Sequence, residues 1–271
     1  MSGIGTPLER LRARIERLGA ALCLGIDPVP GALPDELSRD VQGIERFARG
    51  LVEAVGEQVA AVKPNAAFFE AFGSAGWAAL ERLRGDLPPD LFFIFDAKRG
   101  DMGSTAERYA EAIFGRLRAD AVTLSPYLGS DSVEPFLAFP DRVVYLLART
   151  SNPSAPQLQE LVVNGEPLYL RVAEWVVERW PDPRVGLVVG ATAPEELRLI
   201  RGRLPSPAFL VPGVGAQGGD LAAAVATVHG SAAPGVISVS RGIAGASRGS
   251  DWRDAARSAA AALTEQIRAL M

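Results

Sequence analysis

Charged side chains crowd the stretch "FDAKRGDMGST" (residues 95–105), which directly follows the apolar run "LFFIF". Asp96 and Lys98 stand two positions apart, so on an extended strand both side chains point to the same side. Asp101 follows in the turn beyond them. Alternating carboxylates and ammonium groups form a nearly neutral cluster in which each ion is held by its neighbours. On one strand alone, such a cluster is as readily a structural ion-pair network as a catalytic site.

Charged residues also end two other apolar runs. Asp27 follows "ALCLGI" (21–26), and Lys63 ends "VAAVK" (59–63). If these runs are neighbouring strands of one parallel barrel, their carboxyl ends meet at the same face, where active sites are built. Lys63 then reaches the same space as Asp96 and Lys98. This convergence favours a functional site over a structural network.

A glycine-rich segment further along the chain predicts an anion site. The four glycines of "PGVGAQGGD" (212–220) allow backbone N–H groups to approach an anion closely. A helix is expected to start near Asp220, and its N-terminal dipole adds to the attraction. Arg241 stands two residues after the next apolar run and can offer a forked guanidinium to the same phosphate. Together these features predict a phosphate site.

Short apolar runs alternate with helical patterns along the chain, which predicts parallel strands with helical crossovers. About eight such units suit a (β/α)8 barrel, a fold of about 250 residues. A doubly wound open sheet is the alternative, but its glycine fingerprint should follow the first strand, where this chain has "DPVPG". We therefore predict a barrel with strands at 21–26, 59–63, 91–95, 121–124, 143–147, 185–189, 208–211 and 235–239. The clearest helical patterns lie at 44–58, 105–119, 168–180, 193–204 and 219–228.

The chain has 271 residues, of which 48% are hydrophobic, enough for a large core. No linker or repeat divides it, so we predict a single domain over residues 1–271. Residues 1–19 are expected to form a helical extension, because leucine and isoleucine recur there at helical spacing. This segment lacks the apolar core of a signal peptide.

Composition excludes several classes of function. The net charge of −4 and the lack of a Lys/Arg-rich block argue against a nucleic-acid partner or an anionic membrane surface. No apolar run approaches the roughly 18 residues of a membrane span. The single cysteine, Cys23, excludes an internal disulfide and suits a reducing cytoplasm. With one histidine, His229, neither a zinc site nor a Ser-His-Asp triad is expected.

Six segments together resemble the orotidine 5′-phosphate decarboxylase family. They are "LGIDP" (24–28), "KPNAAFFEAFG" (63–73), "DAKRGDMGSTA" (96–106), "SPYLGSDS" (125–132), "TSNPSA" (150–155) and "PGVGAQGGD" (212–220). The similarity runs from about residue 20 to residue 245. The Lys-Arg-Gly of "DAKRGD" is similar to a branch of the family found in various bacteria. Met102 stands where isoleucine is more usual, a swap that keeps volume and polarity.

The resemblance implies roles for particular residues. Lys63, Asp96, Lys98 and Asp101 would form the charge array at the reacting carbon, with Asp101 supplied by the partner subunit of a homodimer. The remaining roles are substrate binding: Asp27 and the partner's Thr105 at the ribose hydroxyls, Ser151 at the pyrimidine, and Gln217 with Arg241 at the phosphate.

The resemblance implies decarboxylation of orotidine 5′-phosphate to uridine 5′-phosphate, the last step of de novo UMP synthesis. The sequence has no evident cofactor motif, so preorganised charges must stabilise the carbanion left at C6. Our hypothesis is that Lys98 faces this carbanion and then protonates it, while Lys63 and Asp96 keep Lys98 charged and aimed. Two alternatives stay open: a Mg²⁺-dependent sugar-phosphate barrel, which a chelator would inhibit, and a non-catalytic nucleotide-binding barrel.

Overall fold

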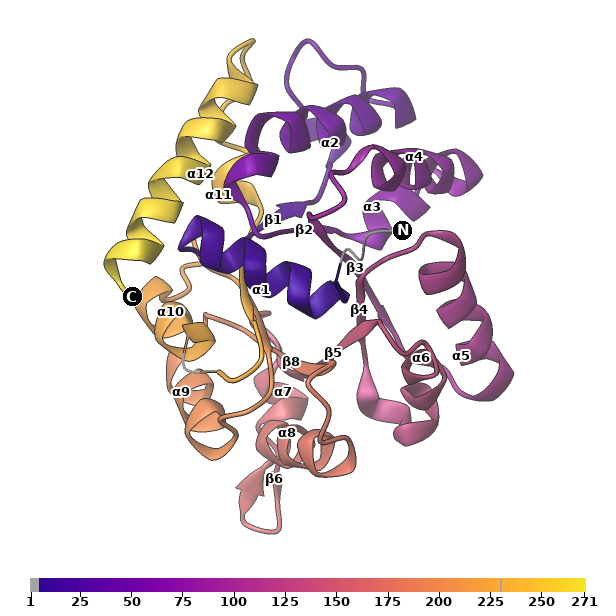
Figure 1. Cartoon of the computed structure of the whole chain (residues 1–271), viewed down its shortest axis with the longest axis vertical. Helices are drawn as coiled ribbons and strands as arrows, with labels where there is room; N and C mark the ends of the chain where they lie inside the picture. The colour runs from indigo at the N-terminus through magenta and orange to yellow at the C-terminus, as the bar shows by residue number, and fades with distance from the viewer. Residues whose placement is uncertain (1–4, 230) are drawn as a thin grey trace.

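The apolar runs of the sequence form the strands of a closed parallel barrel in the computed structural model, which describes residues 5–229 and 231–271 (Figure 1). The order around the barrel is β1-β10-β9-β8-β5-β4-β3-β2. The strands are β1 (Leu22–Ile26), β2 (Ala61–Pro64), β3 (Phe92–Arg99), β4 (Ala121–Leu124), β5 (Val143–Arg149), β8 (Val185–Val189), β9 (Phe209–Pro212) and β10 (Val236–Val239). All eight predicted strands and the predicted barrel are confirmed.

Helices surround the barrel and connect its strands (Figure 1). Every helical pattern named from the sequence is a helix, although the 105–119 segment changes from α-helix to π-helix at Glu111. The helices are α2 (Val41–Val55), α3 (Ala66–Glu70), α4 (Gly73–Asp86), α5 (Gly103–Ala110), η3 (Glu111–Arg116), α6 (Glu134–Leu137), α7 (Pro156–Gln159), α8 (Leu168–Arg179), α9 (Pro194–Arg203), α10 (Leu221–His229), α11 (Arg241–Ala244) and α12 (Trp252–Ala269). Short 3-10 turns lie at Pro30–Ala32, Gly56–Gln58, Pro126–Leu128 and Ser130–Ser132.

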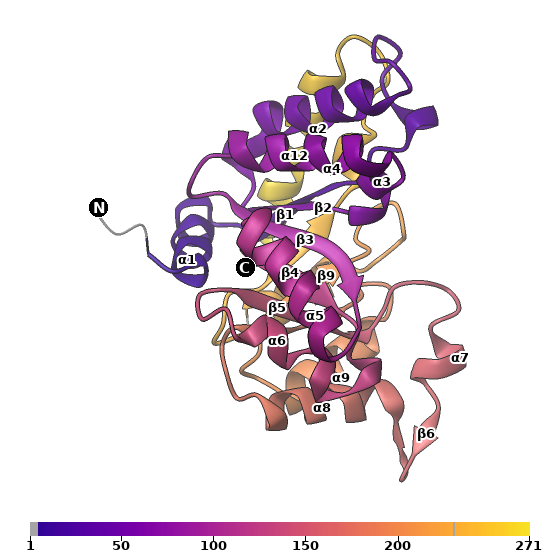
Figure 2. The ribbon, with the colours of Figure 1, turned by 90° about the vertical axis from the view of Figure 1, so that its right-hand side faces the viewer.

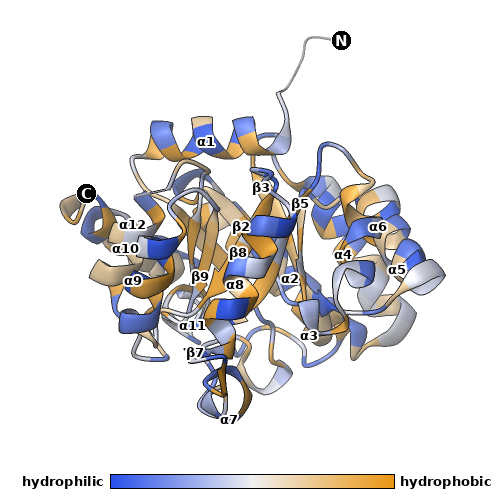
Figure 3. Cartoon of the chain, turned by 90° about the horizontal axis from the view of Figure 1, so that it is seen from below, coloured by the Kyte–Doolittle hydropathy of each residue, from blue (hydrophilic) through white to orange (hydrophobic). Residues whose placement is uncertain are grey.

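Alternate residues of each strand enter two separate apolar layers. On β3, Phe92 and Ile94 belong to the cluster inside the barrel, whereas Phe93 and Phe95 belong to the layer between barrel and helices. Phe95 meets the edge of Trp77 on α4, with ring centroids 5.8 Å apart. Because side chains alternate along a strand, a near-continuous apolar run fills both layers. Figure 3 shows the result, with hydrophobic strands enclosed by helices whose polar faces turn outward.

The predicted N-terminal helix is α1 (Pro7–Leu18), which lies across the amino end of the barrel (Figure 3). Its N-terminus carries a capping box in which Thr6 accepts from the Glu9 N–H and Glu9 accepts from the Thr6 N–H. Gly19 ends the helix in the left-handed conformation. Leu11 and Leu18 are buried against the interior cluster. The helix therefore closes the end of the barrel opposite the charged strand ends.

A small antiparallel hairpin, β6 (Val162–Val163) and β7 (Glu166–Pro167), projects from the segment after β5 beside α7 (Figure 2). None of the described helices is long and apolar enough to cross a membrane. The described residues form one barrel with its surrounding helices. The single domain over 1–271, with residues 1–19 as an extension, stays a prediction because residues 1–4 lie outside the described range.

Candidate active site

A pocket of about 480 Å³ opens at the carboxyl end of the barrel strands, a size typical of small-molecule sites. Seven of the predicted site residues line it: Asp27, Lys63, Asp96, Lys98, Ser151, Gln217 and Arg241. They come from six different strand ends or following loops, spread along the chain from Asp27 to Arg241. The wall also has apolar side chains, among them Leu147, Val188 and Leu210.

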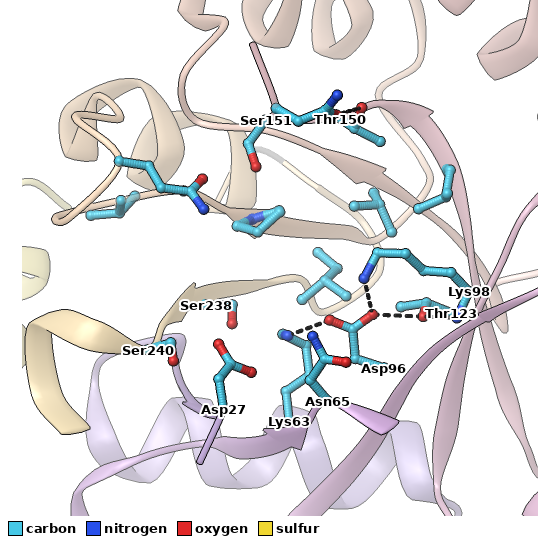
Figure 4. A pocket seen from close by; sticks show the side chains of 18 of the residues that line it. Asp27, Lys63, Asn65, Asp96, Lys98, Thr123, Thr150, Ser151, Ser238 and Ser240 are labelled. Carbon is cyan, nitrogen blue, oxygen red and sulfur yellow. Dashed lines mark hydrogen bonds and ion pairs between the residues drawn. The ribbon is translucent and has the colours of Figure 1, made fainter. Parts of the chain in front are cut away.

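Asp96 is the centre of the charged cluster (Figure 4). Its Oδ2 accepts a hydrogen bond from Lys63 Nζ at 2.5 Å, and its Oδ1 accepts one from Lys98 Nζ at 2.7 Å. The Asp96 and Lys63 side chains are buried, whereas the Lys98 side chain is 48% exposed toward the pocket side. One carboxylate therefore holds two ammonium groups, and only the outer one is accessible.

The two buried ions stabilise each other's charged forms. Burial alone would lower the pKa of Lys63, but the carboxylates of Asp96 and Asp27 outweigh it and raise that pKa. Burial alone would raise the pKa of Asp96, yet Lys63 and Lys98 outweigh it and hold that pKa far below its ordinary range. Lys63 and Asp96 are therefore both ionised at neutral pH.

The backbone at Lys98 differs from the extended strand that the sequence predicts. The pairing of β3 with β4 shifts register between Phe95 and Arg99, and Lys98 lies in this irregularity with φ of +46°. Left-handed backbone costs a non-glycine residue about 1–2 kcal/mol. Asp96 and Lys98 still meet as expected, but through a bulge that turns the lysine back toward its own strand. Hydrogen bonds from neighbouring residues must therefore hold the left-handed backbone of Lys98.

Asp27 lies directly after β1 at the edge of the same cluster (Figure 4). Its Oδ1 is buried and has no hydrogen-bond partner among the described residues. A buried carboxylate oxygen without a donor is costly, so this atom is suited to accept from a ligand hydroxyl. The position agrees with the ribose-binding role that the resemblance implies.

The opposite wall is made by the loops after β5 and β9. Gly213 has φ of +101° and packs tightly between Ser151 and Gln217, which both face the pocket. A side chain at this position would meet the Ser151 Cβ at 3.2 Å and the Gln217 Oε1 at 3.1 Å. Glycine therefore lets this loop approach the β5 loop closely, while Gly215 and Gly218 make its further turns with positive φ.

The predicted helix after the glycine loop is α10, which begins at Leu221. Asp220 caps it, because its Oδ1 accepts from the Ala223 N–H at 2.9 Å. Arg241 opens the short helix α11 after β10 and reaches the same pocket. The two elements expected to bind phosphate thus follow the adjacent strands β9 and β10, and both line the pocket.

Asp101 and Thr105 are not among the residues that line the pocket of their own chain. Asp101 Oδ1 accepts from the Met102 N–H, and Thr105 is exposed on α5. Met102 is also exposed. These positions leave Asp101 and Thr105 available to a second subunit.

Several pocket residues were absent from the sequence prediction. They are Asn65, Thr123, Thr150, Asn152, Gln159, Ser238 and Ser240. Strand alternation could have identified two of them: Thr123 and Ser238 are the last inward-facing positions of β4 and β10. Gln159 ends the short helix α7, and the other four lie on loops, where no periodicity reports the direction of a side chain.

Cys23 and His229 are not among the residues that line the pocket. Cys23 is fully buried on β1, and burial raises the pKa of its thiol to about 12, so it is not a reactive thiolate. His229 is exposed at the end of α10, away from the pocket-lining residues.

Comparison with known proteins agrees with this site. The sequence profile described as "Orotidine 5'-phosphate decarboxylase / HUMPS family" matches residues 21–257. The orotidine 5'-phosphate decarboxylase of Roseiflexus castenholzii is 49% identical over 268 residues, covering 97% of each chain. That of Herpetosiphon aurantiacus is 46% identical over 265 residues, covering 97% of this chain and 98% of the other.

Solved structures show the same barrel. The OMP decarboxylase of Leishmania donovani superposes with a TM-score of 0.85 at 39% identity and covers 98% of both chains. The UMP synthase of the same organism superposes with a TM-score of 0.84 at 41% identity. This match covers 97% of the present chain but 56% of the UMP synthase. The profile match and the full-length relatives show that the chain belongs to the orotidine 5′-phosphate decarboxylase family.

Proposed function

We propose that this chain removes CO₂ from orotidine 5′-phosphate to give uridine 5′-phosphate, the last step of de novo UMP synthesis. The observation that carries the proposal is the Lys63–Asp96–Lys98 cluster in a pocket of about 480 Å³ that Gln217 and Arg241 also line. A nucleotide spans such a pocket with its phosphate at one end and its base at the other. The full-length relatives support this activity.

In the proposed reaction the bond between C6 and the carboxyl carbon breaks, and its electron pair stays on C6. The Lys98 ammonium stabilises this charge and then gives its proton to C6, after which solvent reprotonates the lysine. Asp96 crowds the substrate carboxylate and holds Lys98 in place. No cofactor takes part in this proposed reaction, because the preorganised charges of the pocket supply the stabilisation.

The proposed binding roles are those that the family resemblance implies. Arg241 and Gln217 bind the phosphate, and Ser151 contacts the pyrimidine. Asp27 offers its unpartnered Oδ1 to a ribose hydroxyl. Because the phosphate is remote from the breaking bond, its binding energy can drive closure of the loop at 212–220 and order the site.

We further propose a homodimer in which Asp101 and Thr105 complete the site of the partner subunit. Their absence from the pocket of their own chain supports this arrangement. Asp101 would add a second carboxylate beside Lys98, and Thr105 a second contact to the ribose. A cytoplasmic location is also proposed, because the one cysteine is buried and unable to form an internal disulfide.

The direct experiment is the fall in ultraviolet absorbance as purified protein converts orotidine 5′-phosphate, measured with and without EDTA. We expect decarboxylation that EDTA leaves unchanged. Strong inhibition by EDTA would instead favour a metal-dependent sugar-phosphate enzyme, and no turnover would favour a binding protein.

The shared site is tested by mixing subunits. Lys98→Ala and Asp101→Asn are each expected to be nearly inactive alone. Random mixing should restore about a quarter of wild-type activity, because half of the dimers are mixed and each has one intact site. Lys98→Ala mixed with the Lys98→Ala/Asp101→Asn double variant is the control and should stay inactive. No recovery in verified mixed dimers would refute the shared site.

A further inference from the structure

Lys98 has an unfavourable backbone at the centre of the proposed chemistry. Three residues of β3, Asp96 to Lys98, lie between the paired positions Phe95 and Arg99, whereas β4 has only Thr123 between the matching positions Val122 and Leu124. The surplus residues form the bulge that puts Lys98 at φ of +46°. Lysine rarely adopts this region, so the strand alone does not account for the direction of its side chain.

One hydroxyl connects both ends of this bulge. Thr123 Oγ1 accepts a hydrogen bond from the Lys98 backbone N–H at 3.0 Å and donates one to Asp96 Oδ1 at 2.8 Å. Asp96 Oδ1 is also the atom that accepts from Lys98 Nζ. The backbone of the lysine, the carboxylate and the ammonium group therefore form a closed ring of hydrogen bonds through Thr123 (Figure 4).

The position of Thr123 makes it a rigid support. It is 1% exposed and lies within β4, which pairs with β3 on one side and with β5 on the other. Its single hydrogen goes to the carboxylate, so the oxygen is left to accept the Lys98 N–H. Valine, which has the same shape, can make neither bond.

We propose that Thr123 is a positioning residue that holds the left-handed Lys98 backbone and the Asp96 carboxylate in the geometry needed for protonation of C6. This inference rests on the proposed function, since it assigns Thr123 a role through Lys98. Thr123 affects the orientation of the Lys98 side chain. Loss of the Thr123 hydroxyl therefore lowers kcat rather than substrate affinity. Misplacement of a catalytic group by about 1 Å can cost on the order of a hundredfold in rate.

The test compares Thr123→Val with Thr123→Ser, which keeps the hydroxyl. We expect Thr123→Val to lower kcat by about 10- to 100-fold with KM within about threefold of wild type. Thr123→Ser should stay within about threefold of wild type in both constants. Thr227→Val is the matched control, because Thr227 is also buried but its hydroxyl bonds only to carbonyls of its own helix, α10. This control should not change kcat.

A crystal structure of Thr123→Val provides a second readout, in which Lys98 should leave the left-handed region or its Nζ should leave Asp96. If Thr123→Val does not fold, Thr123→Ala replaces it in the same comparison. Unchanged kcat in the folded variant, or an equal loss in Thr123→Ser, would overturn the positioning role, as would a change confined to KM. Lys98→Ala separates the two proposals: if it retains wild-type kcat, the proposed mechanism itself fails.

Discussion

Two buried aspartates, one at each end of the barrel, both pair with several cations, but we expect different consequences. Asp96 lies at the carboxyl end of β3 between two lysines. Asp120 lies just before β4 at the amino end, where Arg10 and Arg142 approach its Oδ1 at 2.6 and 3.5 Å. Its Oδ2 accepts from the Phe93 N–H at 2.9 Å.

The difference between the two clusters is in the cations. The arginines around Asp120 are mostly buried and come from separate segments: Arg10 from α1, Arg84 from α4 and Arg142 from the loop before β5. They connect three elements to the barrel. Lys98, by contrast, is half-exposed beside the pocket of about 480 Å³. We therefore expect a buried carboxylate with cations to be a structural feature at one end and a reactive one at the other, where one cation is half-exposed at the carboxyl end of the strands.

The largest expected effect comes from removing the charge at the carboxyl end. Asp96→Asn keeps the shape of the side chain but leaves Lys63 buried without its anion and releases Lys98. We expect kcat to fall by about a thousandfold or more, equivalent to about 4 kcal/mol of transition-state stabilisation. The absorbance assay measures it on protein shown to be folded by circular dichroism. A kcat within tenfold of wild type would show that the two ends do not differ in function.

The matching change at the amino end should affect stability alone. Asp120→Asn leaves three arginines without their shared carboxylate, and we expect the free energy of unfolding to fall by about 3 kcal/mol. Urea denaturation measures this change. At a temperature where the variant is folded, kcat should equal that of the wild type. Loss of activity in the folded variant would contradict a purely structural role for Asp120.

Lowering the pH is expected to have a smaller effect, on the free energy of unfolding. The pKa of Asp96 is held below its unfolded value of about 3.9, so its ionised form contributes stability above that pH. This contribution is lost as pH falls from about 4 toward the folded pKa, and we expect it to be on the order of 2 kcal/mol. Urea denaturation between neutral pH and pH 3 should show a steeper loss for wild type than for Asp96→Asn. If the free energy of unfolding fell equally with pH in both proteins, the ion pairs of Asp96 would not stabilise its ionised form.

Local patterns predicted the elements and the charged residues of the pocket. Runs such as "LFFIF" and "GVISV" became strands because alternating apolar side chains can fill the two layers of a barrel wall. Asp27, Lys63 and Asp96 were identified since each ends such a run, and the ends of parallel strands meet in space. The capped amphipathic helix α1 was predicted for the same reason, because its spacing is local.

Other features were decided only by the tertiary structure, because they depend on contacts between residues that are far apart in the sequence. The bulge at Lys98 and the support from Thr123 arise from the register of β3 against β4, which residues 25 positions apart determine together. Arg10 reaches Asp120 across 110 positions. The sequence by itself determined which residues stand at strand ends, because side-chain alternation is a property of neighbouring residues. The tertiary structure decided the orientation of the Lys98 side chain, because strand register and long-range hydrogen bonds exist only when the barrel is closed.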